Sequence, residues 1–248
     1  MPYRAVLFDL FDTLVRFDRE RLPEVRIDGR TVRSTVGHLH AVLRRWRDDV
    51  TVERLYAALL ESWQEAERRR KVDHREIAAV ERFETMFRCL GLDPAACPRD
   101  VFHGMIEAHR RELARVSEFP PHHGPLLARL AERHRLAVVS NFDYSPTALG
   151  ILDTAGVTGL FTAIVVSDVF GWRKPAPGIF HEALRLVGAE PAEALFVGDR
   201  ADIDVAGAQA VGMPAVWVNP RGEPLPPGIA PPAFEIRDLG ELPAIAAG

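Results

Sequence analysis

The chain has 248 residues, of which 47% are hydrophobic and 27% charged, and its formal net charge is −4. This composition is typical of a folded globular protein and excludes the disordered, collagen-like and disulfide-scaffold classes. The small negative charge gives no basis for binding nucleic acid or an anionic membrane surface, so the expected partner is a small molecule.

Cysteine content and hydropathy indicate the cellular compartment in which the protein is expected. Cys89 and Cys97 are too few for a disulfide framework and lack the C-x-x-C spacing of a zinc or redox site. Asp9 interrupts the first apolar run, and no stretch approaches the roughly 18 apolar residues of a membrane span. We therefore expect a cytoplasmic protein without a membrane partner. These patterns specify neither the oligomeric state nor the substrate.

The first predicted element is a strand at residues 3–8, whose near-continuous apolar run indicates burial on both faces. More than a hundred residues separate it from the next such run, too many for one crossover connection. In this segment an Asp28–Gly29 pair between β-branched residues predicts a hairpin. Apolar spacing then predicts helices at 52–70, 75–90 and 99–115. We expect an α-helical cap domain at residues 16–120, which ends at a Pro-Pro pair.

Four more strands are predicted, at 136–139, 162–166, 194–197 and 214–218, with helix-length segments between them at 146–155, 177–187 and 202–211. Alternation of strands and helices predicts an α/β fold with a doubly wound parallel sheet. This core domain is discontinuous and comprises residues 1–15 and 121–248. A proline-rich stretch at 219–232 leads to residues 234–236 and a short final helix.

Polar clusters directly follow three of the predicted strands: Asp9 and Asp12, Ser140 and Asn141, and Asp199 with Asp202 and Asp204. Ligands bind at the carboxyl ends of parallel strands, so we expect these groups to converge on one cleft. No glycine-rich phosphate-binding pattern follows the first strand, which disfavours dinucleotide and P-loop chemistry. A carboxylate there can act as a nucleophile, other carboxylates can hold Mg²⁺, and Lys174 can balance the charge.

Four segments carry a family resemblance, in the order FDLFDTLV, VVSNF, GWRKPAPGIF and FVGDRADIDVAGAQAVGM. They resemble the four motifs of the haloacid dehalogenase superfamily. The resemblance implies a Rossmann-like core with a helical cap inserted after the first motif. It also implies an Mg²⁺-dependent hydrolase, and we expect a phosphatase that acts on a small phosphorylated metabolite.

The resemblance also implies roles for individual residues. Asp9 would be the nucleophile that forms a covalent aspartyl intermediate, and Lys174 would steady both Asp9 and the transferred group. The residues expected to bind the phosphoryl group are Thr13, Ser140 and Asn141. The residues expected to hold Mg²⁺ are Asp9, Asp199, Asp204 and, through its main-chain carbonyl, Phe11.

The first motif departs from the family's phosphatase pattern at Phe11, where those enzymes carry a second aspartate as general acid and base. The nearest carboxylate is Asp12, one residue later. In one hypothesis a helical turn brings Asp12 round to replace the missing acid. In another, the substrate has a good leaving group, as an acyl phosphate does.

Two alternatives to a phosphatase remain. A metal-independent 2-haloacid dehalogenase needs no acid at the position of Phe11, because halide leaves unprotonated. The acidic pattern from Asp199 to Asp204 favours a metal-dependent enzyme instead. The other alternative is a non-catalytic phosphate- or metabolite-binding protein on the same fold.

Overall fold

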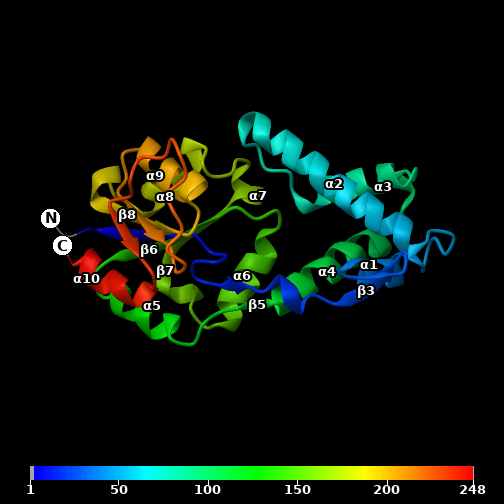
Figure 1. The fold of residues 1–248 in the computed structure, drawn as a ribbon, viewed down its shortest axis with the longest axis horizontal. Helices are drawn as coiled ribbons and strands as arrows, with labels where there is room; N and C mark the ends of the chain where they lie inside the picture. The colour runs from blue at the N-terminus through cyan, green and yellow to red at the C-terminus, as the bar shows by residue number, and fades with distance from the viewer. Residues whose placement is uncertain (1–2, 248) are drawn as a thin grey trace. The chain divides into compact units, whose positions relative to one another are not determined.

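The computed structural model describes residues 3–247, and their contacts divide the chain into two units. Unit 1 comprises the residues up to Arg16 and those from Phe119 onward, and unit 2 is the continuous segment Phe17–Glu118. Two short strands, β2 (Arg16–Phe17) and β5 (Ser117–Glu118), pair with each other where the chain passes between the units. Unit 1 is thus built from both ends of the chain, as the colours in Figure 1 show.

Unit 1 contains a parallel six-stranded sheet in the order β10-β9-β8-β1-β6-β7. The strands are β1 (Ala5–Phe8), β6 (Arg135–Ser140), β7 (Phe161–Val166), β8 (Ala194–Gly198), β9 (Ala215–Val218) and β10 (Phe234–Ile236). The first strand of the chain lies at the centre, with Leu7 opposite Ala137 on one side and Phe196 on the other. The predicted α/β fold class with a parallel sheet is confirmed.

The strands β1 and β8 are apolar along their whole length because both faces of the sheet are covered. Every residue of β1 has an exposed fraction of 0%. One core cluster joins Leu7, Val139 and Phe196 of the sheet to Ile179 and Phe180. Figure 1 shows α8 and α9 on one side of the sheet and α5 and α10 on the other. Each large side chain buried in this way contributes about 1.5–3 kcal/mol to folding.

The helices of unit 1 follow the strands: α5 (His123–Ala131), α6 (Ser145–Thr154), α7 (Ser167–Phe170), α8 (Pro177–Val187), α9 (Ala206–Ala210) and α10 (Leu242–Ala246). The helices predicted at 146–155 and 177–187 are confirmed. The one predicted at 202–211 begins instead as a π-helical turn, Ala201–Val205, before α9. Single 3₁₀ turns lie at Thr158–Leu160, Pro191–Glu193 and Leu239–Glu241.

Unit 2 is mainly helical. Its helices are α1 (Val36–Leu43), α2 (Val52–Asp73), α3 (Ala79–Cys89) and α4 (Arg99–Arg115), with 3₁₀ turns at Arg19–Arg21 and Pro94–Ala96. The predicted hairpin is present as β3 (Glu24–Ile27) and β4 (Arg30–Arg33). Its turn residues Asp28 and Gly29 have φ values of 48° and 77°, as a tight two-residue hairpin turn requires.

The start of α3 differs from the prediction, at Ala79 rather than at residue 75. The preceding segment is held as a loop by Arg70, whose guanidinium donates to the carboxylate of Glu76 at 2.6 Å and to the carbonyl of Ile77 at 2.9 Å. Because this buried ion pair holds Glu76 in the loop, α3 does not begin at residue 75.

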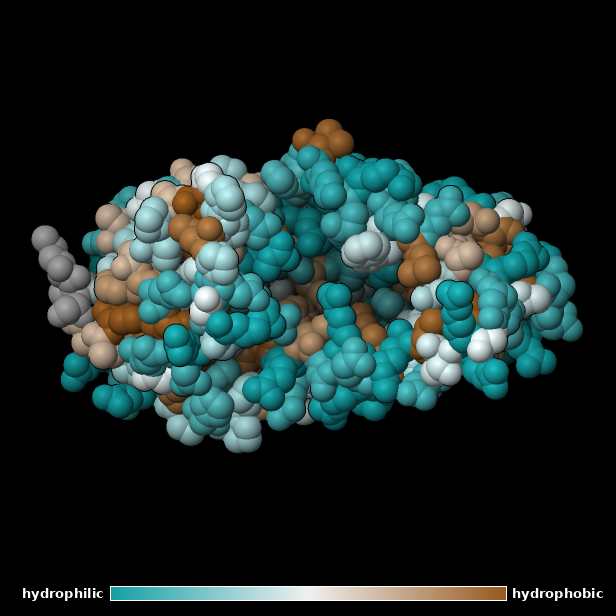
Figure 2. All heavy atoms as spheres, viewed as in Figure 1, coloured by the Kyte–Doolittle hydropathy of each residue, from teal (hydrophilic) through white to brown (hydrophobic). Residues whose placement is uncertain are grey.

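The run of basic residues at the end of α2 is neutralised within unit 2. Arg68, Arg69 and Arg70 each form an ion pair with a glutamate. Figure 2 shows a mostly hydrophilic surface over this helix. The positive charges of these three arginines are therefore balanced by neighbouring glutamates. Among residues 3–247, no helix has the length and apolar character needed to cross a membrane.

Candidate active site

The carboxyl ends of β1 and β8 bring three carboxylates together. Asp9 follows β1, Asp199 follows β8 and Asp204 lies in the π-helical turn, and each offers an oxygen within 4.8 Å of the others. The ladder continues to Asp9, whose N–H donates to the carbonyl of Val197 at 2.9 Å. Asp9 and Asp204 are 8% and 1% exposed. The structure thus places these three predicted residues in one cluster, in which Asp9 and Asp204 are buried and Asp199 is half-buried.

Lys174 lies between two of these carboxylates. Its Nζ is 2.6 Å from an oxygen of Asp9 and 2.8 Å from an oxygen of Asp204. The ammonium also lies over the ring of Phe196, 5.1 Å from the centroid. Burial acts to lower the pKa of Lys174, but the neighbouring Asp204 and Asp9 outweigh it and raise that pKa above its ordinary value. Lys174 is therefore a cation at neutral pH.

One ammonium does not neutralise three carboxylates. Burial raises the pKa of Asp9 to about 6, and the charge of Asp204 adds to the rise while Lys174 opposes it. Burial also raises the pKa of Asp199 to about 7, with further contributions from Asp9, Asp204 and Asp12. Clustered carboxylate oxygens with excess negative charge are the ligands that a hard divalent cation such as Mg²⁺ prefers. Asp9, Asp199 and Asp204 therefore fit Mg²⁺.

The backbone around Asp204 leaves room for its carboxylate. A Cβ atom at Gly198, the last residue of β8, would lie 2.5 Å from the side-chain carbons of Asp204, too close for any other residue. The main-chain N–H of Arg200 donates to the second oxygen of Asp204 at 3.0 Å. The guanidinium of Arg200 pairs instead with Asp202 at 2.8 Å, on the exposed rim. Asp202 thus lies outside the carboxylate cluster.

Thr13 and Ser140 supply two buried hydroxyl groups at this end of the sheet. Their exposed fractions are 6% and 1%, and neither side-chain oxygen has a hydrogen-bond partner within residues 3–247. Because buried polar groups nearly always have partners, two such hydroxyls indicate a place for a polar ligand.

Asn141 makes a contact that was not predicted, and its phosphate contact stays a prediction. Its amide nitrogen donates to the carbonyl of Lys174 at 2.9 Å, and the N–H of Lys174 donates to its amide oxygen at 2.8 Å. Both polar atoms of the side chain therefore bind the main chain of Lys174. This contact holds the segment that carries the ammonium.

The backbone turns after β1, so Asp12 does not continue the extended conformation of the strand. Its φ is 62°, in the left-handed region that aspartate tolerates better than most residues. Its charge contributes to the raised pKa of Asp199, so its carboxylate acts electrostatically on the cluster. The ring of Phe11 packs against that of Phe142, with centroids 4.8 Å apart. The metal contact through the carbonyl of Phe11 stays a prediction.

Sequence reasoning missed Trp217 of β9. This side chain is 4% exposed, and its indole Nε1 donates to the carbonyl of Asp199 at 2.8 Å. One signal was available, because a buried tryptophan needs an acceptor for its N–H. The parallel register pairs Trp217 with Gly198, next to Asp199.

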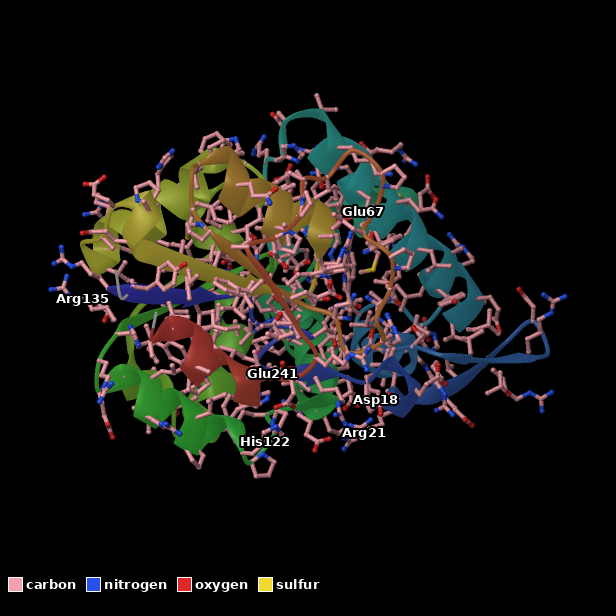
Figure 3. All side chains as sticks on the ribbon, turned by 60° about the vertical axis from the view of Figure 1, so that its left-hand side comes forward. Asp18, Arg21, Glu67, His122, Arg135 and Glu241 are labelled. Atoms are coloured by element: carbon pink, nitrogen blue, oxygen red, sulfur yellow. The ribbon has the colours of Figure 1, made fainter. Side chains whose placement is uncertain are left out.

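A structural contact lies at the amino ends of the strands, opposite the carboxylate cluster. Arg135, at the start of β6 (Figure 3), donates to the carbonyl of Val187 at the end of α8, at 2.7 Å. Arginine side chains commonly satisfy the last carbonyls of a helix in this way. The two ends of the parallel strands thus have different roles. A helix terminus is fixed at the amino ends, and the carboxylate cluster lies at the carboxyl ends.

Comparisons with known proteins give a consistent result. The family of haloacid dehalogenase-like hydrolases matches residues 3–212. A glyceraldehyde 3-phosphate phosphatase from Methanopyrus kandleri is 29% identical over 221 residues, which cover 89% of this chain and 85% of that protein. Haloacid dehalogenase-like hydrolase domain-containing protein 3 from Bos taurus is 44% identical over 95 residues, which span 38% of this chain and 37% of that protein.

A solved structure shares the whole fold. A 2-haloacid dehalogenase from Pseudomonas syringae pv. Tomato DC3000 is similar with a TM-score of 0.69 and 27% identity, over 99% of this chain and 98% of that chain.

Proposed function

This chain belongs to the haloacid dehalogenase-like hydrolases, and on that premise we propose that it is an Mg²⁺-dependent phosphatase that acts on a small phosphorylated metabolite. The observation that carries the proposal is the unbalanced charge of Asp9, Asp199 and Asp204, because the one buried lysine contacts only Asp9 and Asp204. A site that has to bind a divalent cation explains this imbalance. The relative named as a glyceraldehyde 3-phosphate phosphatase supports the substrate class.

In this reaction Asp9 attacks phosphorus in line, and the bond from phosphorus to the leaving oxygen breaks. Water then attacks the same phosphorus, which releases phosphate and frees Asp9. Lys174 keeps the carboxylate of Asp9 ionised and oriented before the first step. The hydroxyls of Thr13 and Ser140 donate to the phosphoryl oxygens. Asp9, Asp199, Asp204 and the carbonyl of Phe11 would hold Mg²⁺, which would supply positive charge to neutralise those oxygens.

Hydrolytic dehalogenation of a small 2-haloacid is the second candidate. The solved dehalogenase with 27% identity favours it, as does Phe11 in place of an acid. In that reaction Asp9 attacks carbon and halide leaves, so neither a metal nor a proton donor is needed. Binding of a phosphorylated metabolite without turnover is the third candidate.

Hydrolysis of acetyl phosphate, p-nitrophenyl phosphate and 2-chloropropionate, each with Mg²⁺ and with EDTA, separates these functions. We expect phosphate release with Mg²⁺ that falls to background in EDTA and returns when Mg²⁺ is added back. Chloride release that EDTA does not affect would identify a dehalogenase. Thermal stabilisation by phosphate without turnover on any substrate would support the binding protein.

We further propose that Asp12 replaces the general acid missing at Phe11. Asp12→Asn keeps a residue type that tolerates positive φ but removes the proton donor. In single-turnover assays, leaving-group release from an alkyl phosphate should fall by about 10²- to 10⁴-fold. Release of acetate from acetyl phosphate should change little, because carboxylate leaves without protonation. Equal losses on both substrates would instead indicate that Asp12 acts only through the charge of the cluster.

A further inference from the structure

The peptide unit that joins Asp199 to Arg200 is held at both of its polar ends. Its carbonyl accepts a hydrogen bond from Nε1 of Trp217 at 2.8 Å, and its N–H donates to the carboxylate of Asp204 at 3.0 Å. Because the peptide group is planar, these two bonds fix its orientation. That orientation sets the backbone angle next to Asp199, and with it the direction in which the Asp199 side chain leaves the main chain.

Asp199 lies close to two other carboxylates, because its oxygen is within 4.8 Å of those of Asp9 and Asp204. The ammonium of Lys174 contacts the other two, at 2.6 Å from Asp9 and 2.8 Å from Asp204. Asp199 is also less buried than its partners in the cluster. Like charges repel, so the carboxylate of Asp199 is pushed away from the other two when no cation lies between them. A neutral hydrogen bond on the main chain fixes the backbone that carries Asp199 without adding charge to the cluster.

Trp217 is well suited to supply that bond. Its side chain belongs to the core cluster that contains Phe196 and Ala215, and it is 4% exposed. Its backbone is fixed in β9 opposite Gly198. Packing therefore sets the direction of the indole N–H, so the donor is rigid. A water molecule at the same place would satisfy the carbonyl without holding it in one position.

We propose that Trp217 is a positioning residue that aims the carboxylate of Asp199 at the metal, an inference that rests on the Mg²⁺ site of the proposed function. Mg²⁺ demands nearly ideal octahedral geometry, whereas Ca²⁺ accepts more varied arrangements of oxygen ligands. Loss of the indole N–H should therefore weaken Mg²⁺ binding more than Ca²⁺ binding. A loss of general packing would weaken both alike.

The experiment is calorimetric titration of the full chain with Mg²⁺ and with Ca²⁺ at pH 8. Trp217→Phe keeps an aromatic ring in the core, and incorporation of 3-benzothienylalanine at position 217 keeps the indole shape with sulfur in place of N–H. Both variants should bind Mg²⁺ about tenfold more weakly than the unmodified chain, with a smaller change for Ca²⁺. Their hydrolysis rates should recover at high Mg²⁺ concentration. Trp46→Phe, a change in unit 2 where Trp46 stacks on Phe87, is the control.

Two results would overturn the proposal. One is unchanged Mg²⁺ affinity in the folded benzothienyl variant, which is the closest match in shape. The other is an equal loss of affinity for both cations. If the unmodified chain itself does not bind Mg²⁺, the proposed metal site fails, and this inference fails with it. Because that result appears before any variant is made, the two failures are distinguishable.

Discussion

Asp9→Asn is expected to abolish phosphate release while the protein stays folded. Asparagine has nearly the shape of aspartate but cannot attack phosphorus, so no covalent intermediate forms. Loss of a nucleophile that acts with its neighbours as a unit lowers the rate by roughly 10⁴- to 10⁶-fold. The check is phosphate release with Mg²⁺, together with mass spectrometry of acid-quenched protein. A phosphorylated peptide that contains residue 9 should be found in the unmodified chain and not in the variant.

The same variant tests the charge of the cluster through stability. Burial raises the pKa of Asp9 from its ordinary 3.8 to about 6. A carboxyl group with a raised pKa in the folded state favours folding when protonated, and that contribution is lost as the pH rises through about 6. In EDTA, Asp9→Asn should therefore be more stable than the unmodified chain at pH 8 relative to pH 4.5. Asp202→Asn, on the exposed rim, is the matched control and should retain activity. Full activity in Asp9→Asn would exclude an aspartyl intermediate at this residue.

Lys174→Met is expected to cause the largest loss of stability. Methionine fills a similar volume but leaves Asp9 and Asp204 without their shared cation. Removal of one partner from a buried ion pair costs about 3–5 kcal/mol, because the remaining charge is uncompensated. The hydrolysis rate should fall by about 10²- to 10³-fold, as when a preorganised donor is lost from an active site.

The pH dependence of the destabilisation tests whether the uncompensated charge causes it. Lys174 lowers the pKa of Asp9, so without the lysine that pKa rises above about 6. At pH 5 Asp9 is then protonated and needs no partner, whereas at pH 8 it must ionise in a buried place. Urea unfolding in EDTA should show a larger destabilisation at pH 8 than at pH 5. Lys71→Met, which changes the chain's other lysine at an exposed position, is the control. Equal destabilisation at both pH values would mean that Lys174 acts through packing alone.

The strands of the sheet and the residues that follow them could be predicted because their cause is local. Residues 194–197 are apolar without interruption and are followed by Gly198 and Asp199. This short segment therefore indicates a strand, the burial of that strand and a polar group at its carboxyl end. The helix α5 was not predicted, because Gly124 and Pro125 at its start are weak helix formers. Its buried Leu127 and Leu130 indicate that packing outweighs this preference.

Contacts between distant segments could not be predicted. The amide of Asn141 meets the main chain of Lys174 across 33 positions, and Trp217 meets Asp199 across 18. Each contact depends on where a loop passes in space, which no local pattern encodes. The sequence therefore indicated which polar residues follow the strands, but it did not indicate which residues those side chains and backbone groups contact.

The central place of β1 has a consequence for how the chain folds as it is synthesised. Its neighbours β6 and β8 begin at Arg135 and Ala194. The first strand can therefore pair on both sides only after most of the chain has been synthesised. Unit 2, which is one continuous segment, has all of its partners much earlier. Such long-range pairing slows folding and prolongs exposure of an apolar strand. The nascent chain should therefore order its middle before its beginning.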